Sequence, residues 1–307
     1  MGTPDFAVGV LDTLVKHQHT IVGVITAPDR PAGRGRKLNE SAVKKYALDK
    51  GLTVLQPKNL KDETFLKSLE QLKANLQIVV AFRMLPKKVW AMPAYGTFNL
   101  HASLLPQYRG AAPINWAIMN GETRTGVTTF FIDDKIDTGA VILQEEAPIF
   151  ENDNAQDLHD RLMVLGAALV LKTAECIHKG DVKTTIQKDT TDLKLAHKLH
   201  RETCEINWER PGNEIYNFIR GLSPYPSAWS TLYNGNEKML TKIFTTELQL
   251  MHHELKPGRL LFNKKELKVV VKNGYLNLLE IQLQGKKRMA VKDVLNGLQL
   301  EENAYFG

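Results

Sequence analysis

Short apolar runs alternate with amphipathic stretches through the first part of the chain. Two stretches, 41–50 and 63–73, have the spacing of apolar positions that is typical of helices. Four runs have the length and β-branched composition of buried strands: 20–26, 75–82, 96–101 and 126–132. Strands that are apolar throughout and separated by helices predict an α/β domain, whose mostly parallel sheet is covered on both faces.

The pattern changes in the last third of the chain. Residues 190–205 are polar and charged, and the Gly, Ser and Pro residues of 221–227 interrupt helical spacing. Short strand-like segments then follow at close spacing, with turns at Asn234-Gly235 and Asn273-Gly274. These segments are 228–232, 259–262, 267–272 and 275–284. We therefore expect a first domain over 1–188, a linker over 189–204 and a small β-barrel or β-sheet domain over 205–307.

Composition narrows the class of protein. The chain has 307 residues, of which 43% are hydrophobic and 24% charged, so it is neither disordered nor collagen-like. No apolar run reaches the ~18 residues of a membrane span, and the start lacks a signal-peptide pattern, so we expect a cytoplasmic protein without membrane contact. Cys176 and Cys204 have no disulfide or zinc-ligand spacing, so we expect no metal. The net charge of +6 permits a polyanionic partner without establishing one.

Candidate chemistry is concentrated after two of the predicted strands. Asn99 and His101 are two residues apart, so both side chains point to one face of their strand. Acidic side chains follow the strand 126–132, at Asp133, Asp134 and Asp137. If the two strands are parallel, their ends meet and bring His101 close to one aspartate. An imidazole can exchange protons near neutrality, and an amide can donate to a developing oxyanion.

Structural interpretations of these residues stay open at this point. An Asn-x-His pair on a strand is also typical of a satisfied polar pair, and Asp137-Thr138-Gly139 is also typical of a plain turn. No Ser or Cys nucleophile with a matched base is evident. The chemistry that fits is therefore one in which the substrate supplies its own nucleophile.

Several motifs, taken together and in order, resemble the folate-dependent formyltransferases, and among them those that act on methionyl-tRNA. The segments that carry the resemblance are 99–110, 136–139, 2–7, 28–38, 202–208 and 219–224. The resemblance implies a Rossmann-like catalytic domain followed by an OB-like barrel that holds tRNA. It further implies transfer of the formyl group of 10-formyltetrahydrofolate to the α-amine of methionine on initiator tRNA. We also expect a monomer.

The resemblance also implies roles for individual residues. Asn99, His101 and Asp137 form the catalytic trio, in which Asn99 and protonated His101 stabilise an oxyanion while Asp137 keeps His101 charged and helps to move protons. The expected folate-binding residues are Phe82, Arg83, Met84, Leu85, Ser103, Leu104, Leu105, Pro106, Asp133 and Asp134. Many relatives have Tyr-Gly in place of Phe82-Arg83, so the side-chain roles of these two residues differ from the family pattern.

Two basic stretches are the expected contacts to tRNA. The first is a Gly- and Pro-rich loop, from which the resemblance assigns Arg34 first, then Arg36 and Lys37. In the second, residues 256–292, ten Lys and Arg residues stand against Glu266 and Glu280. Its expected contacts are Lys264, Lys265, Lys286, Lys287 and Arg288.

One feature departs from the family pattern, and several other functions need to be weighed. Relatives have a β-strand directly before Gly2-Thr3-Pro4, where this sequence has only Met1, so we expect the first strand of the sheet to be missing. Glycinamide ribonucleotide formyltransferase has one domain only. The hydrolase domain of formyltetrahydrofolate dehydrogenase and the sugar-nucleotide formyltransferases lack the loop 33–37. A non-catalytic RNA-binding protein need not retain the trio, and a dinucleotide oxidoreductase needs a Gly-x-Gly-x-x-Gly motif that is absent.

Overall fold

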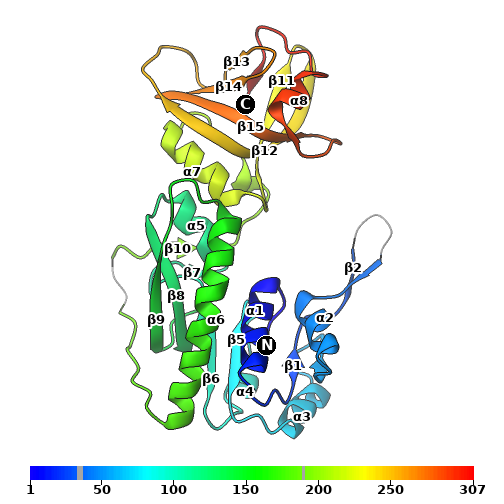
Figure 1. Cartoon of the computed structure of the whole chain (residues 1–307), viewed down its shortest axis with the longest axis vertical. Coiled ribbons are helices and arrows are strands. Elements are labelled where there is room, and N and C mark those ends of the chain that lie inside the picture. The colour runs from blue at the N-terminus through cyan, green and yellow to red at the C-terminus, as the bar shows by residue number, and fades with distance from the viewer. Residues whose placement is uncertain (33–36, 189–190) are drawn as a thin grey trace. The chain divides into compact units, whose positions relative to one another are not determined.

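The computed structural model describes residues 1–32, 37–188 and 191–307 (Figure 1). The chain divides into two compact units. The first contains Met1–Gly110, Thr125–Pro148 and His159–Leu195. The second contains Ala111–Arg124, Ile149–Leu158 and Ala196–Gly307.

The first unit is a mixed α/β structure, as the sequence predicts. Its four-stranded sheet has the order β5-β6-β8-β9, and β1 pairs with β4 in parallel. Its helices are α1 (Asp5–Lys16), α2 (Ala42–Asp49), α3 (Glu63–Gln71), α4 (Lys87–Trp90) and most of α6 (Ala155–Lys179). Its strands are β1 (Val24–Ile25), β2 (Arg30–Ala32), β3 (Lys37–Asn39), β4 (Val54–Leu55), β5 (Gln77–Val80), β6 (Thr97–His101), β7 (Arg109–Gly110), β8 (Arg124–Phe131) and β9 (Val141–Pro148).

Local sequence explains where two of these helices begin. Ser41 precedes α2, and its hydroxyl oxygen accepts a hydrogen bond from the amide of Lys44 at 3.1 Å. Asp62 precedes α3 and accepts from the amide of Phe65 at 3.0 Å. Both side chains satisfy amide groups that the first turn of a helix leaves unpaired.

The sheet is not parallel throughout. β5 and β6 are parallel, but β8 runs antiparallel to β6, with Phe98 opposite Phe131 and His101 opposite Thr128. The prediction that 126–132 continues the parallel sheet is therefore wrong. A parallel pair needs a crossover helix packed on the sheet. The helix that lies between β6 and β8 in the chain, α5 (Pro113–Met119), belongs to the second unit instead.

Met1 and Gly2 lie between β1 and β5, where the sequence leads us to expect a missing strand. The amide of Gly2 donates to the Ile25 carbonyl at 3.0 Å, and the amide of Val80 donates to the Met1 carbonyl at 2.9 Å. The predicted strand over 20–26 is wrong in extent, because only Val24 and Ile25 pair with β4. Its earlier residues line a cavity of about 140 Å³ instead of contacting a neighbouring strand.

The second unit contains a nearly closed antiparallel β-barrel, as the resemblance implies. Its strands are β11 (Ala228–Asn234), β12 (Glu237–Leu250), β13 (Leu260–Phe262), β14 (Leu267–Val271), β15 (Gly274–Leu283), β16 (Met289–Ala290) and β17 (Tyr305–Phe306). Their order is β13-β14-β15-β12-β11-β17, with β16 beside β15. The amide of Phe306 donates to the Gly258 carbonyl at 2.9 Å, which joins the two ends of this order and covers their free edges.

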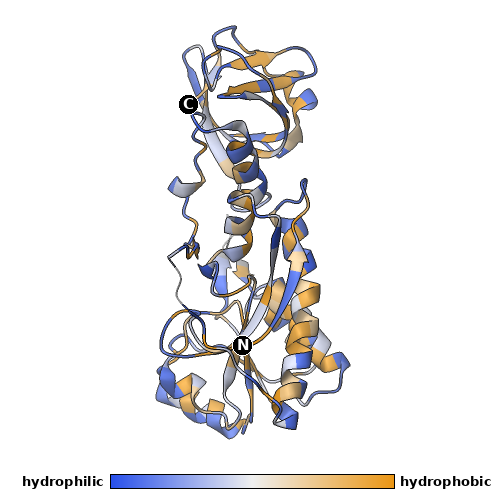
Figure 2. Cartoon of the chain, turned by 90° about the vertical axis from the view of Figure 1, so that its left-hand side faces the viewer, coloured by the Kyte–Doolittle hydropathy of each residue, from blue (hydrophilic) through white to orange (hydrophobic). Residues whose placement is uncertain are grey.

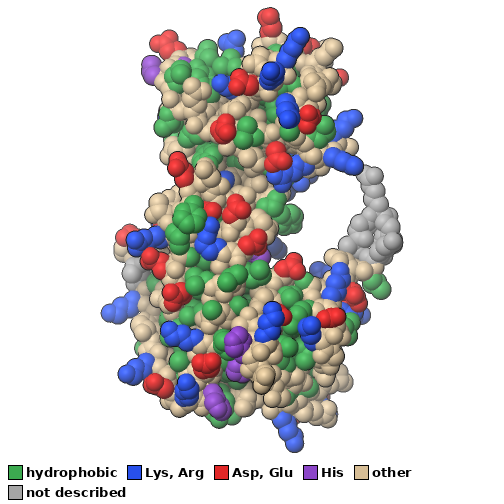
Figure 3. Space-filling view, in the orientation of Figure 1, with side chains coloured by type: hydrophobic (Ala, Val, Ile, Leu, Met, Phe, Trp, Pro, Cys, Tyr) green, Lys and Arg blue, Asp and Glu red, His purple; other side chains and the backbone are tan. Residues whose placement is uncertain are grey.

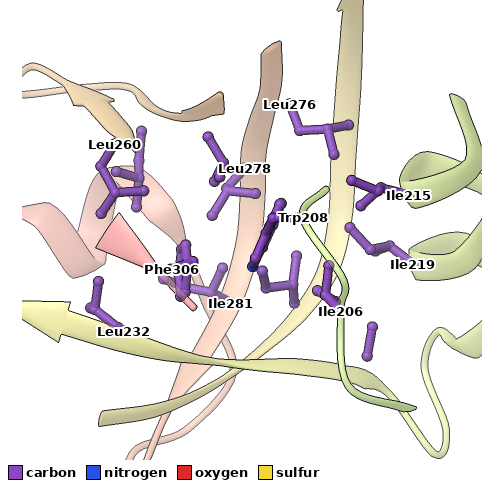
Figure 4. Packing of buried hydrophobic residues seen from close by; sticks show 14 of the residues in the cluster. Ile206, Trp208, Ile215, Ile219, Leu232, Leu260, Leu276, Leu278, Ile281 and Phe306 are labelled. Carbon is purple, nitrogen blue, oxygen red and sulfur yellow. The ribbon is translucent and has the colours of Figure 1, made fainter. Parts of the chain in front are cut away.

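Apolar side chains fill this barrel. In Figure 2 its strands carry most of the hydrophobic residues, and its connecting loops are largely hydrophilic. The Trp208 ring stacks on Phe306 with centroids 5.5 Å apart, and its Nε1 donates to the Ser230 hydroxyl at 2.9 Å. Figure 4 shows Ile215 and Ile219 reaching this core from α7 (Gly212–Leu222). The remaining elements are β10 (Leu195–Ala196), the 3₁₀ helix η1 (Glu202–Cys204) and α8 (Val291–Leu295). None of the helices in the described parts of the chain is long and apolar enough to cross a membrane.

Candidate active site

His101 is the last residue of β6, and its ring is buried with 6% of its surface exposed. Its Nε2 lies 2.8 Å from the carbonyl oxygen of Tyr108. A carbonyl can only accept, so Nε2 carries the proton of this bond. The other ring nitrogen, Nδ1, lies 3.8 Å from Oδ2 of Asp137. Both ring nitrogens therefore face oxygen atoms, Nε2 within hydrogen-bond distance and Nδ1 within ion-pair distance.

The loop between β8 and β9 brings Asp137 to this position. The amide of Gly110 donates to Oδ2 of Asp137 at 2.9 Å, so the same oxygen faces both Gly110 and His101. Asp137 has φ of 54° and Tyr108 has φ of 60°, which is the left-handed region that non-glycine residues seldom adopt. The two residues that contact the His101 ring are therefore both held in strained backbone conformations, as is common at functional sites.

The proximity of His101 and Asp137 arises differently from the way the sequence suggests. Antiparallel pairing places the end of β8 at the start of β6, with Phe131 opposite Phe98. The loop that follows β8 then returns toward His101 before β9 begins. The expectation that the ends of parallel strands bring the two side chains together is therefore wrong, although the two side chains do meet.

Asn99 lies two residues before His101 on β6 and is partly exposed. A strand rises about 3.3 Å per residue, so the two side chains leave the same face of β6 about 7 Å apart. Among the described residues, the Asn99 amide has no hydrogen-bond partner. It is therefore available to a ligand that binds beside His101.

Gln187 supports the loop of Asp137, and the sequence did not reveal it. Its amide donates to the backbone carbonyls of Asp137 at 2.9 Å and of Gly139 at 2.8 Å. Its own carbonyl oxygen accepts from Nε of Arg109 at 3.0 Å. Gln187 stands in a polar stretch without a motif, so only its position in the fold identifies it.

The sequence Asp137-Thr138-Gly139 forms part of a tight loop. A Cβ on Gly139 would lie 1.7 Å from the backbone oxygen of Phe131, so only glycine fits there. The hydroxyl of Thr138 donates to the carboxylate of Asp133 at 2.9 and 3.0 Å. Asp133 also accepts from the amide of Lys135 at 3.0 Å. Asp133 therefore holds the loop in shape in addition to facing the cavity described next.

Five of the expected folate-binding residues line one cavity of about 760 Å³ in the first unit: Arg83, Met84, Leu85, Asp133 and Asp134. The guanidinium of Arg83 donates to the carbonyls of Lys58, at 2.9 Å, and Pro57, and it also lies over the Phe82 ring with its Cζ 5.6 Å from the centroid. Phe82 itself does not line this cavity.

The other expected folate-binding residues form a compact loop after His101. The Ser103 hydroxyl donates to the Gln107 carbonyl at 2.6 Å, and the Leu105 amide donates to the Thr128 hydroxyl at 3.1 Å. The bond between Leu105 and Pro106 is cis. Ser103, Leu104, Leu105 and Pro106 do not line the cavity of about 760 Å³, so the structure does not bring the whole expected set together.

The expected tRNA contacts of the first unit are Arg34, Arg36 and Lys37. Arg34 and Arg36 fall outside the described residues, and of Lys37 only the backbone, in β3, is described.

In the second unit, the expected tRNA contacts occupy two exposed turns. Lys264 and Lys265 follow β13, and Lys286, Lys287 and Arg288 follow β15. The Arg288 guanidinium pairs with Glu280 and lies over the Phe244 ring, so it is already occupied within the barrel. On the face that Figure 3 shows, Lys and Arg side chains of this unit are interspersed with Asp and Glu.

Within the described ranges, no three His, Cys, Asp or Glu side chains are placed to hold a metal ion.

Comparisons with known proteins agree with the resemblance in the sequence. The family described as "Formyl transferase" matches residues 1–173, and "Formyl transferase, C-terminal domain" matches residues 198–299. The protein named methionyl-tRNA formyltransferase of Flavobacterium johnsoniae is 60% identical over 304 residues, which cover 99% of this chain and 96% of that protein. The protein of the same name from Bacteroides fragilis is 53% identical, over 98% of this chain and 95% of its own length.

Solved structures share the fold at lower identity. An N-formyltransferase from Helicobacter canadensis, in complex with folinic acid and dTDP-3-aminofucose, has a TM-score of 0.64 and 21% identity, with 94% of this chain and 97% of that chain covered. HypX from Aquifex aeolicus, in complex with tetrahydrofolic acid, has a TM-score of 0.59 and 19% identity, with 83% of this chain and 45% of that chain covered. Both family models and the relatives of high identity lead to one conclusion: this chain belongs to the formyl transferase family.

Proposed function

We propose that the protein transfers the formyl group of 10-formyltetrahydrofolate to the α-amino group of methionine on initiator tRNA. The observation that carries the proposal is the His101 ring, which lies between the Tyr108 carbonyl and the Asp137 carboxylate and beside the free amide of Asn99. Two relatives support the proposal. They are named methionyl-tRNA formyltransferase and are 60% and 53% identical to this chain over nearly their whole length.

The reaction needs no nucleophile from the protein. The methionine amine attacks the formyl carbon, and a new C–N bond forms while the formyl oxygen becomes negative. Asn99 donates to this oxygen, and the imidazolium of His101 stabilises it by its charge. Nδ1 is the ring nitrogen that faces the reacting group, because Nε2 is held by Tyr108.

Collapse of the tetrahedral intermediate completes the transfer. The bond between the formyl carbon and N10 of the folate breaks, and the proton that the amine loses must reach this departing nitrogen. The Asp137 carboxylate is the base that receives the proton, and the His101–Asp137 pair returns it to N10. The amide of Gly110 and the side chain of Gln187 hold Asp137 in place for this exchange.

The folate and the tRNA require different surfaces. We assign the folate to the cavity lined by Arg83, Met84, Leu85, Asp133 and Asp134. Residues 1–188 form the catalytic domain in this proposal, and residues 205–307 provide tRNA contacts through Lys264, Lys265, Lys286 and Lys287. Lysines in exposed turns neutralise phosphates without reading bases, so tRNA binding should weaken as salt rises.

The test is a formyl-transfer assay with four acceptors: methionyl initiator tRNA, methionyl elongator tRNA, free methionine and a nucleotide-linked amino sugar. We expect transfer to the initiator tRNA above the others, with a KM for tRNA that rises with salt. Transfer to the amino sugar instead would favour a sugar-nucleotide formyltransferase. Hydrolysis of the folate without an acceptor would favour the hydrolase alternative.

A further inference from the structure

One wall of the cavity of about 760 Å³ is basic. Five exposed cations line it, on the segment after β4 and on the segment that leads from β5 into α4. They are Lys58, Lys61, Arg83, Lys87 and Lys88. The acidic residues of the lining, Asp133 and Asp134, lie on the loop after β8.

The backbone that carries these cations is ordered by side-chain contacts. Arg83 donates to the carbonyls of Pro57 and Lys58 and so ties the two basic segments to each other. Asn59 accepts from the amide of Lys61 at 3.0 Å, and Nζ of Lys87 lies 5.9 Å from the centroid of the Trp90 ring. The cations therefore stand on a defined scaffold.

The four lysines of this wall form no ion pair in the described part of the chain. Among the described residues, no acidic side chain lies within ion-pair distance of Lys58, Lys61, Lys87 or Lys88. Like charges around one cavity repel one another, so this arrangement lowers stability unless an anion binds there. Separate ammonium groups on flexible stems suit a chain of separate anionic groups, whereas a single bidentate anion would suit arginine better.

We infer that the four lysines bind the glutamate end of the folate and favour co-substrates that carry additional γ-linked glutamates. This inference rests on the proposed function, since it takes the cavity as the folate site. Each added γ-linked glutamate contributes one further carboxylate at the outer end of the co-substrate. A wall that presents four unpaired cations gains more from several carboxylates than from the pair on a single glutamate.

The direct test is equilibrium binding of tetrahydrofolate with one or three glutamates, measured by calorimetry without tRNA. We expect the triglutamate to bind about tenfold more tightly, equivalent to about 1.4 kcal/mol. This advantage should shrink as the salt concentration is raised, because the proposed pairs of lysines and glutamate carboxylates are exposed to solvent. Equal affinity of the two forms for the unaltered protein would overturn the inference.

A matched pair of variants distinguishes binding by the four cavity lysines from the effect of the protein's net charge. The first variant combines Lys58→Gln, Lys61→Gln, Lys87→Gln and Lys88→Gln, and its triglutamate advantage should fall to about twofold or less. The control combines Lys67→Gln, Lys73→Gln, Lys172→Gln and Lys179→Gln, four exposed residues of the same unit that do not line the cavity. Both variants lower the net charge from +6 by four, and the control should keep the full advantage.

The remaining outcomes are also decisive. An unchanged triglutamate advantage in the first variant would overturn the inference. A raised KM for tRNA with that advantage intact would assign the lysines to RNA instead. Because the binding assay needs no formyl transfer, loss of the proposed function and loss of the tail site are distinguishable.

Discussion

His101 donates from Nε2 to the carbonyl oxygen of Tyr108 at 2.8 Å, and this bond fixes the orientation of the ring. Tyr108 holds φ of 60°, so its carbonyl is presented by a backbone conformation that is costly for a tyrosine. The result is that Nδ1 faces Asp137 and the space beside Asn99. The strained loop thereby determines which nitrogen of the ring is available for chemistry.

We predict that Asn99→Ala lowers kcat by about 100-fold, because it removes a donor to the developing oxyanion. The thermal midpoint should change little, because the amide of Asn99 has no hydrogen-bond partner among the described residues. Steady-state formyl transfer and a melting curve measure the two quantities. A kcat close to that of the unaltered protein would show that Asn99 is not an oxyanion donor.

Replacing Gln187 tests the support of Asp137. Gln187→Leu keeps the approximate size and removes the donors to the Asp137 and Gly139 carbonyls. We expect kcat to fall by about tenfold and the pH profile of kcat to change, since a displacement on the order of 1 Å can cost more than that. The neighbouring exposed variant Lys188→Gln should leave both unchanged. A Gln187→Leu enzyme with a normal pH profile would mean that Gln187 only stabilises the fold.

Gly139→Ala should destabilise the first unit by at least about 2 kcal/mol, because its Cβ would overlap the Phe131 backbone oxygen. Gly297→Ala is the matched control, since a Cβ there meets nothing within 4 Å. Denaturant unfolding of the two variants compares the losses. Equal losses would indicate that the loop after β8 adjusts freely.

The buried thiol of Cys204 predicts an alkaline loss of stability. Burial raises the pKa of Cys204, so the unfolded chain releases this proton near pH 8.5 while the folded chain still holds it. The unfolded state then binds fewer protons, and the free energy of unfolding falls as pH rises above that value. The free energy of unfolding should fall more between pH 7.5 and pH 9.5 for the unaltered protein than for Cys204→Ala. A Cys204→Ala variant whose free energy of unfolding falls as much as that of the unaltered protein would refute the assignment.

The apolar runs locate eight of the seventeen strands in the described residues, because buried side chains leave a signal in the sequence. The run 96–101 corresponds to β6 over Thr97–His101, and 228–232 corresponds to β11 over Ala228–Asn234. The sequence did not reveal β12, Glu237–Leu250, because polar and charged residues occupy most of its exposed positions: Glu237, Lys238, Glu247 and Gln249. The direction of β8 is equally hard to predict from the sequence, since most of β8 is buried, as a parallel strand would be, yet it pairs antiparallel with β6.

The sequence likewise predicts some residues of the candidate site and not others. His101 and Asp137 stand in motifs, so the sequence could single them out, although the loop that joins them was not foreseeable from the assumed parallel pairing. Gln187 acts through hydrogen bonds to the backbone of that loop, and no local sequence pattern marks such a residue. The roles of the trio in catalysis, and of the lysines of the barrel in binding tRNA, stay predictions.

The measurement that tests the central claim most directly is a double-mutant cycle on formyl transfer to methionyl initiator tRNA with His101→Ala, Asp137→Asn and both changes together. The account predicts that each single variant loses at least about 100-fold in kcat and that the double variant is little worse, because the two residues act as one unit. All three proteins should bind folate with similar affinity. Near-normal turnover in either single variant, or losses that simply multiply in the double variant, would contradict it.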